Sequence, residues 1–107
     1  MHIAIDTSPL DSGHQGRGVG TYTRQLIDSL KKEAPSTHFE LTSQPQSSKA
    51  NLVHYPYFDL FFHTLPLYKP KPSIVTIHDL IPLNFANQFP IGIKGTFSHL
   101  AQQLSLL

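Results

Sequence analysis

Cysteine is absent from this 107-residue chain, and residues of both charge signs are scarce. Without cysteine, the chain can form neither a disulfide framework nor a thiolate metal site. Charged residues make up only 14% of the chain and the formal net charge is +1. Because binding along a nucleic acid requires a basic patch or stripe, we expect no nucleic-acid partner.

Long apolar runs are also missing. Nowhere do about 18 apolar residues follow one another, which is the length that a membrane-spanning helix requires. The first residues lack a basic segment followed by an apolar run, so no signal peptide is expected. These absences predict a cytoplasmic protein, and peripheral attachment to the inner face of a membrane stays compatible with them.

The apolar segments that are present predict an α/β fold. Hydrophobic residues make up 39% of the chain, enough for one domain with a modest core. Residues 2–6 have the pattern of a short buried strand, and residues 19–33 place apolar side chains on one face of a helix. Further elements are predicted in this order: strands at 39–42, 51–54 and 73–77, exposed turns or loops at 7–13 and 43–49, and a second helix at 91–107.

A strand–helix–strand unit of this kind normally makes its two strands parallel. We therefore predict a Rossmann-like parallel sheet flanked by helices. Three or four parallel strands with two helices cover such a sheet only partly, whereas parallel sheets are normally covered on both faces. We expect a partial domain that is completed outside this sequence and whose exposed sheet edge favours self-association.

Three closely spaced glycines, Gly16, Gly18 and Gly20, open the predicted first helix. Backbone N–H groups at the start of a helix favour an anion, and Arg17 adds a charged group suited to phosphate. A merely mobile connection is the alternative. A dinucleotide-binding fingerprint fits poorly, because Thr21 stands where the third glycine is needed and the segment does not directly follow the first strand.

Polar and aromatic residues follow the predicted strands at their carboxyl ends, where open parallel sheets bind ligands. His78 could act as a hydrogen-bond donor or base, or simply bond a loop carbonyl. Asp79 suits substrate contact or bonding of loop N–H groups. Tyr55 and Tyr57 could stack on a sugar or pack in the core. The seven histidines show no ligand spacing, so no metal is expected.

Four blocks of the sequence together carry a resemblance to a known family. The blocks are IAIDTSPL at 3–10, GRGVGTYT at 16–23, LVHYP at 52–56 and VTIHDLIP at 75–82. In this order they resemble the amino-terminal half of family 4 glycosyltransferases. The resemblance extends over residues 3–82 and leaves the last part of the chain unmatched.

This resemblance implies a GT-B architecture, in which two Rossmann-like domains face each other across a cleft. The chain, 1–107, would be part of the first domain. Members of the family transfer a sugar from a nucleotide-sugar donor to a saccharide or lipid-linked acceptor, with retention of anomeric configuration, and many serve polysaccharide biosynthesis. They usually need no bound metal, and we expect no cofactor. By position, the Gly16–Gly20 segment would lie near the donor diphosphate, and His78 would contact the donor sugar.

One departure from the family pattern limits this interpretation. The family's donor-nucleotide site, with two glutamates separated by seven residues, belongs to the carboxyl-terminal domain, which has no counterpart here. Glu33 and Glu40 lie in the wrong half and at a different spacing. We therefore expect no turnover by the chain alone. A non-catalytic phosphate- or sugar-binding module and a purely structural partner domain remain alternative interpretations.

Overall fold

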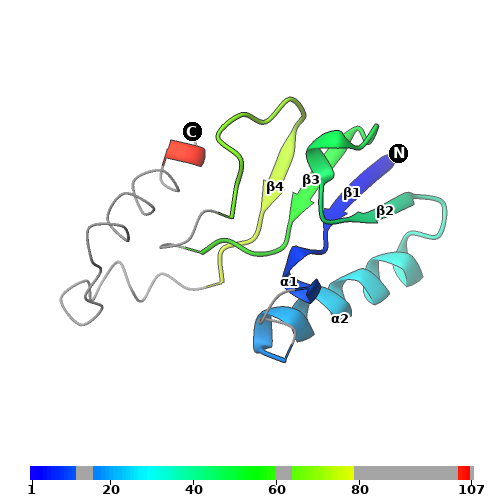
Figure 1. Cartoon of the computed structure of the whole chain (residues 1–107). Coiled ribbons are helices and arrows are strands. Elements are labelled where there is room, and N and C mark those ends of the chain that lie inside the picture. The colour runs from blue at the N-terminus through cyan, green and yellow to red at the C-terminus, as the bar shows by residue number, and fades with distance from the viewer. Residues whose placement is uncertain (12–15, 60–63, 79–103, 107) are drawn as a thin grey trace.

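The structure is a computed structural model that describes residues 1–11, 16–59, 64–78 and 104–106. In this part of the chain, four parallel strands form one sheet (Figure 1). The elements along the chain are β1 (His2–Asp6), α1 (Ser8–Asp11), α2 (Gly18–Glu33), β2 (His38–Thr42), the 3-10 helix η1 (Pro45–Ser47), β3 (Leu52–Tyr55) and β4 (Ser73–Val75). The predicted parallel α/β fold is thereby confirmed.

The strand order is β2-β1-β3-β4. β1 pairs with β2 on one side, with Ile5 opposite Leu41, and with β3 on the other side, with Ile5 opposite His54. β4 continues the sheet beyond β3. The chain thus leaves β1 in one direction to form β2 and returns past β1 to form β3.

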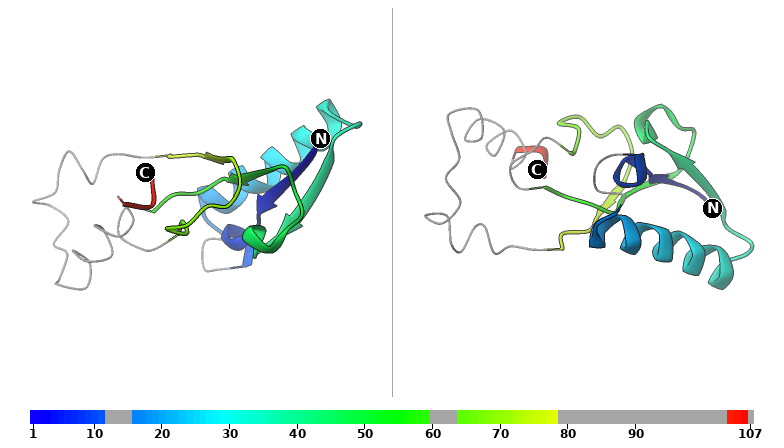
Figure 2. Two further views of the ribbon diagram at one scale, coloured as in Figure 1. Left: turned by 90° about the horizontal axis from the view of Figure 1, so that it is seen from above. Right: turned by 60° about the horizontal axis from the view of Figure 1, so that its bottom comes forward.

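The two faces of the sheet pack against different parts of the chain. Strand alternation places Ala4, Val53 and Tyr55 on one face, where they form a buried cluster with Ala50, Phe58 and Leu65. On the opposite face lies Ile5, which is completely buried. The long helix α2 runs along one side of the sheet, while η1 lies on the other (Figure 2).

The sequence of α2 explains its position. Its apolar residues recur at helical spacing, and Ile27 is buried as predicted. Thr23, one turn earlier, is completely buried, and its hydroxyl is satisfied by donating to the Val19 carbonyl oxygen at 2.8 Å. The helix ends at Glu33, and Pro35 follows two residues later. The polar residues Asp28, Lys31, Lys32 and Glu33, on the opposite side of the helix, are all exposed.

Several predicted boundaries differ from the observed ones. The turn expected at 7–13 contains the helical turn α1, whose Pro9 is buried. The loop expected at 43–49 contains η1, in which Pro45 is buried. β3 begins and ends one residue later than predicted, and β4 ends at Val75 rather than Ile77. The helix predicted at 91–107 lies outside the described residues, apart from 104–106.

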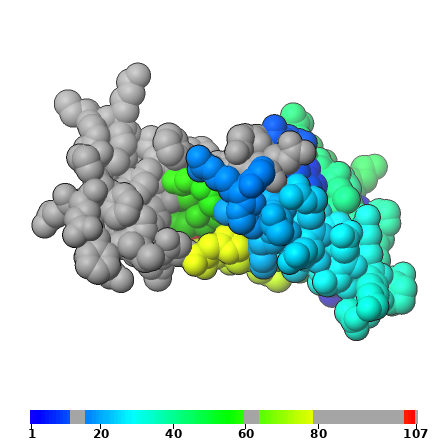
Figure 3. Space-filling view, turned by 90° about the horizontal axis from the view of Figure 1, so that it is seen from below, coloured from blue at the N-terminus to red at the C-terminus, as the bar shows by residue number. Residues whose placement is uncertain are grey.

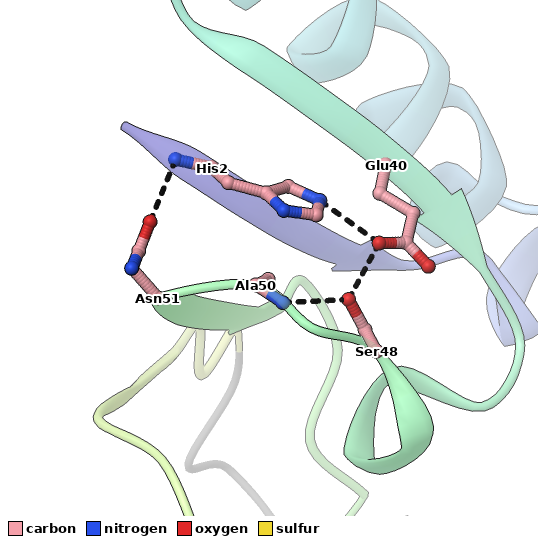
Figure 4. A network of polar contacts seen from close by, with 5 residues as sticks. All are labelled: His2, Glu40, Ser48, Ala50 and Asn51. Carbon is pink, nitrogen blue, oxygen red and sulfur yellow. Dashed lines mark hydrogen bonds and ion pairs between the residues drawn. The ribbon is translucent and has the colours of Figure 1, made fainter.

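A polar network fastens the η1 segment to the sheet (Figure 4). Glu40 on β2 accepts a hydrogen bond from the Ser48 hydroxyl at 2.5 Å, and its Oε2 lies 2.9 Å from Nε2 of His2 on β1. The Ser48 hydroxyl oxygen also accepts from the Ala50 N–H, and Asn51 accepts from the His2 N–H. Since these contacts use strand residues and loop residues together, they hold the β2–β3 connection against the sheet.

Candidate functional site

The carboxyl ends of β1 and β3 mark a topological switch point. β2 and β3, the two strands that follow β1 in the sequence, lie on opposite sides of it. Open α/β sheets bind ligands beyond the carboxyl ends of the strands at such a point, because the connections diverge there and leave room between them. Asp6 and Tyr55 end these two strands, and the start of α2 follows β1 after α1.

The start of α2 lacks a side-chain cap. Arg17 is the N-cap residue, with extended backbone, and its side chain makes no capping hydrogen bond. The Thr21 N–H donates to the Arg17 carbonyl at 3.1 Å, so the N–H groups of residues 18–20 precede the first bond of the helix and have no partner within α2. These groups, together with the helix dipole, are suited to an anion.

Gly16 and Gly18 are not required by the protein's own packing. A Cβ atom built on either residue meets no heavy atom within 4 Å. No glycine of the described residues has a positive φ, so the backbone conformation would accept other residues as well. What the two glycines do supply is open space beside the free N–H groups.

His78 lies against α2 near its start. Its ring meets that of Tyr22 edge to face, with centroids 4.5 Å apart. Figure 3, a view from the side of α2, shows the first turn of the helix beside the end of the β4 segment. The Nε2 of His78 lies 2.8 Å from the Pro56 carbonyl oxygen. Because a carbonyl only accepts, Nε2 carries a proton, and in the neutral ring Nδ1 is the acceptor.

The segment after β3 brings a second polar group to the same edge. The Tyr57 hydroxyl donates to the Asp59 carboxylate at 2.5 Å. Burial and this carboxylate raise the pKa of Tyr57 well above its ordinary value, while the positive charge of Arg17 acts in the opposite direction. The segment after β3 thus places a phenol and a carboxylate beyond the carboxyl end of the strand.

Asp6 and Tyr55 occupy neighbouring positions on the buried-cluster face of the sheet. Only 9% of Asp6 and 2% of Tyr55 is exposed. The Asp6 Oδ1 accepts hydrogen bonds from the Ser8 hydroxyl at 2.6 Å and from the Ser8 N–H at 3.0 Å. Burial raises the pKa of the Asp6 carboxyl, and these hydrogen bonds oppose the shift. Burial and the nearby Asp6 carboxylate both raise the pKa of Tyr55.

The structure therefore gathers most of the predicted site residues at one edge. It places His78 against Tyr22, two residues after Gly20, and it shows the loop-carbonyl contact that was one of the two interpretations of His78. Tyr55 belongs to the core cluster, and Tyr57 is half-buried beside Asp59. Asp79 lies outside the described residues. The contact between Tyr22 and His78 was not predicted, because it joins residues 56 positions apart in the sequence.

His54 is half-buried, unlike the exposed His78, and bonds within the sheet. Its Nε2 lies 3.0 Å from the Thr76 hydroxyl oxygen, and burial lowers its pKa. Within the described ranges, no three residues of the ligand types His, Cys, Asp and Glu gather as a metal site. No helix in these ranges is both long enough and apolar enough to cross a bilayer.

Comparison of the chain with known protein families, with curated proteins and with solved structures finds no match. The geometry of the switch point and the sequence blocks that surround it are what point to a function.

Proposed function

We propose that the chain is the amino-terminal part of a retaining glycosyltransferase of the GT-B type, and that its switch-point edge holds the diphosphate and sugar of a nucleotide-sugar donor. The observation that carries this proposal is the contact between His78 and Tyr22, 4.5 Å between ring centroids. It joins the histidine block at 75–82 to the helix whose start bears the glycines.

The arrangement suits the chemistry of such a transfer. When the bond from sugar to diphosphate breaks, negative charge develops on the leaving phosphate. The uncapped N–H groups at 18–20 and the nearby Arg17 are fixed before the reaction and would stabilise that charge. His78, with Nδ1 available as an acceptor, would orient a hydroxyl of the donor sugar.

A titration of the chain with UDP and GDP, followed by backbone NMR, tests the phosphate part of this proposal. We expect chemical-shift changes at residues 16–20 with both diphosphates and none with uridine or guanosine, which lack the phosphates. Nucleotide-sugars should additionally shift the ring signals of His78. Equal shifts with the diphosphates and the nucleosides would contradict a phosphate site at the helix start.

Two variants that each remove one positive charge make this test specific. Arg17→Gln should weaken UDP binding, because it removes the charge beside the glycines. Lys31→Gln removes the same charge from the exposed far end of α2, 14 residues later and about 20 Å along the helix axis, and should leave the affinity unchanged. Equal losses in both variants would indicate only a general charge effect.

Transfer itself would be tested in a protein that contains a donor-binding domain. There, His78→Ala should slow transfer with folding preserved, each tenfold loss in kcat/KM reporting about 1.4 kcal/mol of transition-state stabilisation. Phosphate binding without any role for His78 in transfer would favour the alternative of a non-catalytic phosphate- or sugar-binding module.

A further inference from the structure

Two nearly buried side chains at the switch point have hydrogen-bonding capacity that the fold does not use. Asp6 ends β1 and Tyr55 ends β3. The strand register pairs Ile5 with His54, so Asp6 and Tyr55 lie one residue further along neighbouring strands, on the same face. The two residues are thus neighbours across the β1–β3 ladder at the carboxyl ends of their strands.

The unused capacity can be assigned to particular atoms. Asp6 accepts both of its hydrogen bonds, from Ser8, on Oδ1. Oδ2 of Asp6 and the hydroxyl of Tyr55 have no hydrogen-bond partner among the described residues. In the same part of the chain, every side-chain oxygen or nitrogen that is fully buried does have a partner. Solvent therefore reaches both atoms, although 91% or more of each residue is buried.

The architecture does not account for these two atoms. The bonds from Ser8 to Oδ1 hold the start of α1, and an asparagine oxygen could accept them equally well. The Tyr55 ring packs in the apolar cluster with Val53 and Phe58, where a phenylalanine ring would fill the same space. Placing a carboxylate at a buried position costs free energy unless its charge is used.

The pair has the chemistry to recognise a hydroxyl group. A carboxylate oxygen accepts a hydrogen bond, while a phenol can donate one, and a hydroxyl group is both donor and acceptor. A phosphate is disfavoured here, because the carboxylate would repel it. The edge thus has a cationic part at Arg17 and the α2 start, and an acidic part at Asp6.

We propose that Asp6 and Tyr55 form a binding site for a hydroxyl group of a neutral saccharide. The site rests on the proposed function, in which the cationic part of the same edge holds the diphosphate. Asp6 accepts a hydrogen bond from the saccharide hydroxyl through Oδ2, and Tyr55 donates one to the same hydroxyl or to its neighbour.

The test is an NMR titration of the 107-residue chain with methyl glucoside, methyl mannoside and methyl galactoside as neutral probes. We expect at least one probe to shift the backbone signals of Asp6, Ser8 and Tyr55. Tyr55→Phe and Asp6→Asn should each weaken that binding by roughly three- to tenfold, the usual effect of losing one hydrogen bond. Tyr68→Phe removes the same hydroxyl from a residue that is 79% exposed and should have no effect.

Three results would overturn the proposal. One is the absence of shifts at Asp6 and Tyr55 with every probe, and another is unchanged affinity in both variants when their spectra show an intact fold. The third is binding confined to an amine such as glucosamine, which would indicate a cation site at Asp6. A parallel UDP titration separates this proposal from the proposed function. UDP is expected to change the chemical shifts of residues 16–20, whereas the saccharides are expected to change those of Asp6 and Tyr55.

Discussion

The substitution Gly18→Ala separates binding from folding at the start of α2. It adds one methyl group at the first residue of the helix, where a Cβ meets no heavy atom within 4 Å. The backbone there does not have a positive φ, so alanine adopts it without strain. The protein itself therefore gives no reason for the variant to be less stable.

The expected magnitudes follow from this geometry. Alanine is favoured over glycine in helices by up to about 1 kcal/mol, and the gain is smaller at a terminal position. We expect the free energy of unfolding to be unchanged or raised within that limit. An N–H group bonds a phosphate oxygen at roughly 2.9 Å, so a methyl group beside it obstructs the ligand. We expect the Kd for UDP to rise by about tenfold, or about 1.4 kcal/mol.

Urea unfolding measures the stability and NMR titration with UDP measures the affinity. Ser29→Ala, on the exposed side of α2, is the matched control, because it raises helix propensity away from the site. Unchanged UDP affinity in Gly18→Ala would refute a phosphate position beside Gly18. A loss of stability beyond about 1 kcal/mol would refute the reasoning that the glycine has no packing role.

Two further predictions concern the sheet. Ile5→Ala should lower the free energy of unfolding by about 2–5 kcal/mol in urea denaturation, since Ile5 is completely buried at the centre of the sheet and alanine would leave a cavity there. A smaller loss would contradict this prediction and mean that neighbouring side chains move in to fill the cavity. The Ser48 and His2 contacts lower the pKa of Glu40 below its ordinary value of 4.5. Wild type should therefore be more stable than Glu40→Gln above about pH 4.5 and lose this advantage as the pH falls through the folded-state pKa, and a difference independent of pH would contradict this.

Part of the site could be predicted from residue type and spacing. The three glycines before an apolar stripe indicated a helix start suited to an anion, and the polar residues after each strand indicated the binding edge. The position of Asp6 at the end of the first predicted strand can be read from the sequence. The pairing of Asp6 with Tyr55 depends on which strands are neighbours and on their register, neither of which sequence spacing specifies.

The sequence by itself determined the local elements, because apolar periodicity and breakers such as Pro35 act over a few residues. It therefore predicted α2 nearly to its ends and each strand to within two residues. Only the tertiary structure decided the order β2-β1-β3-β4, the burial of Thr23 and the meeting of His78 with Tyr22. These features depend on long-range pairing, in which a shift of one residue would exchange the two faces of every strand.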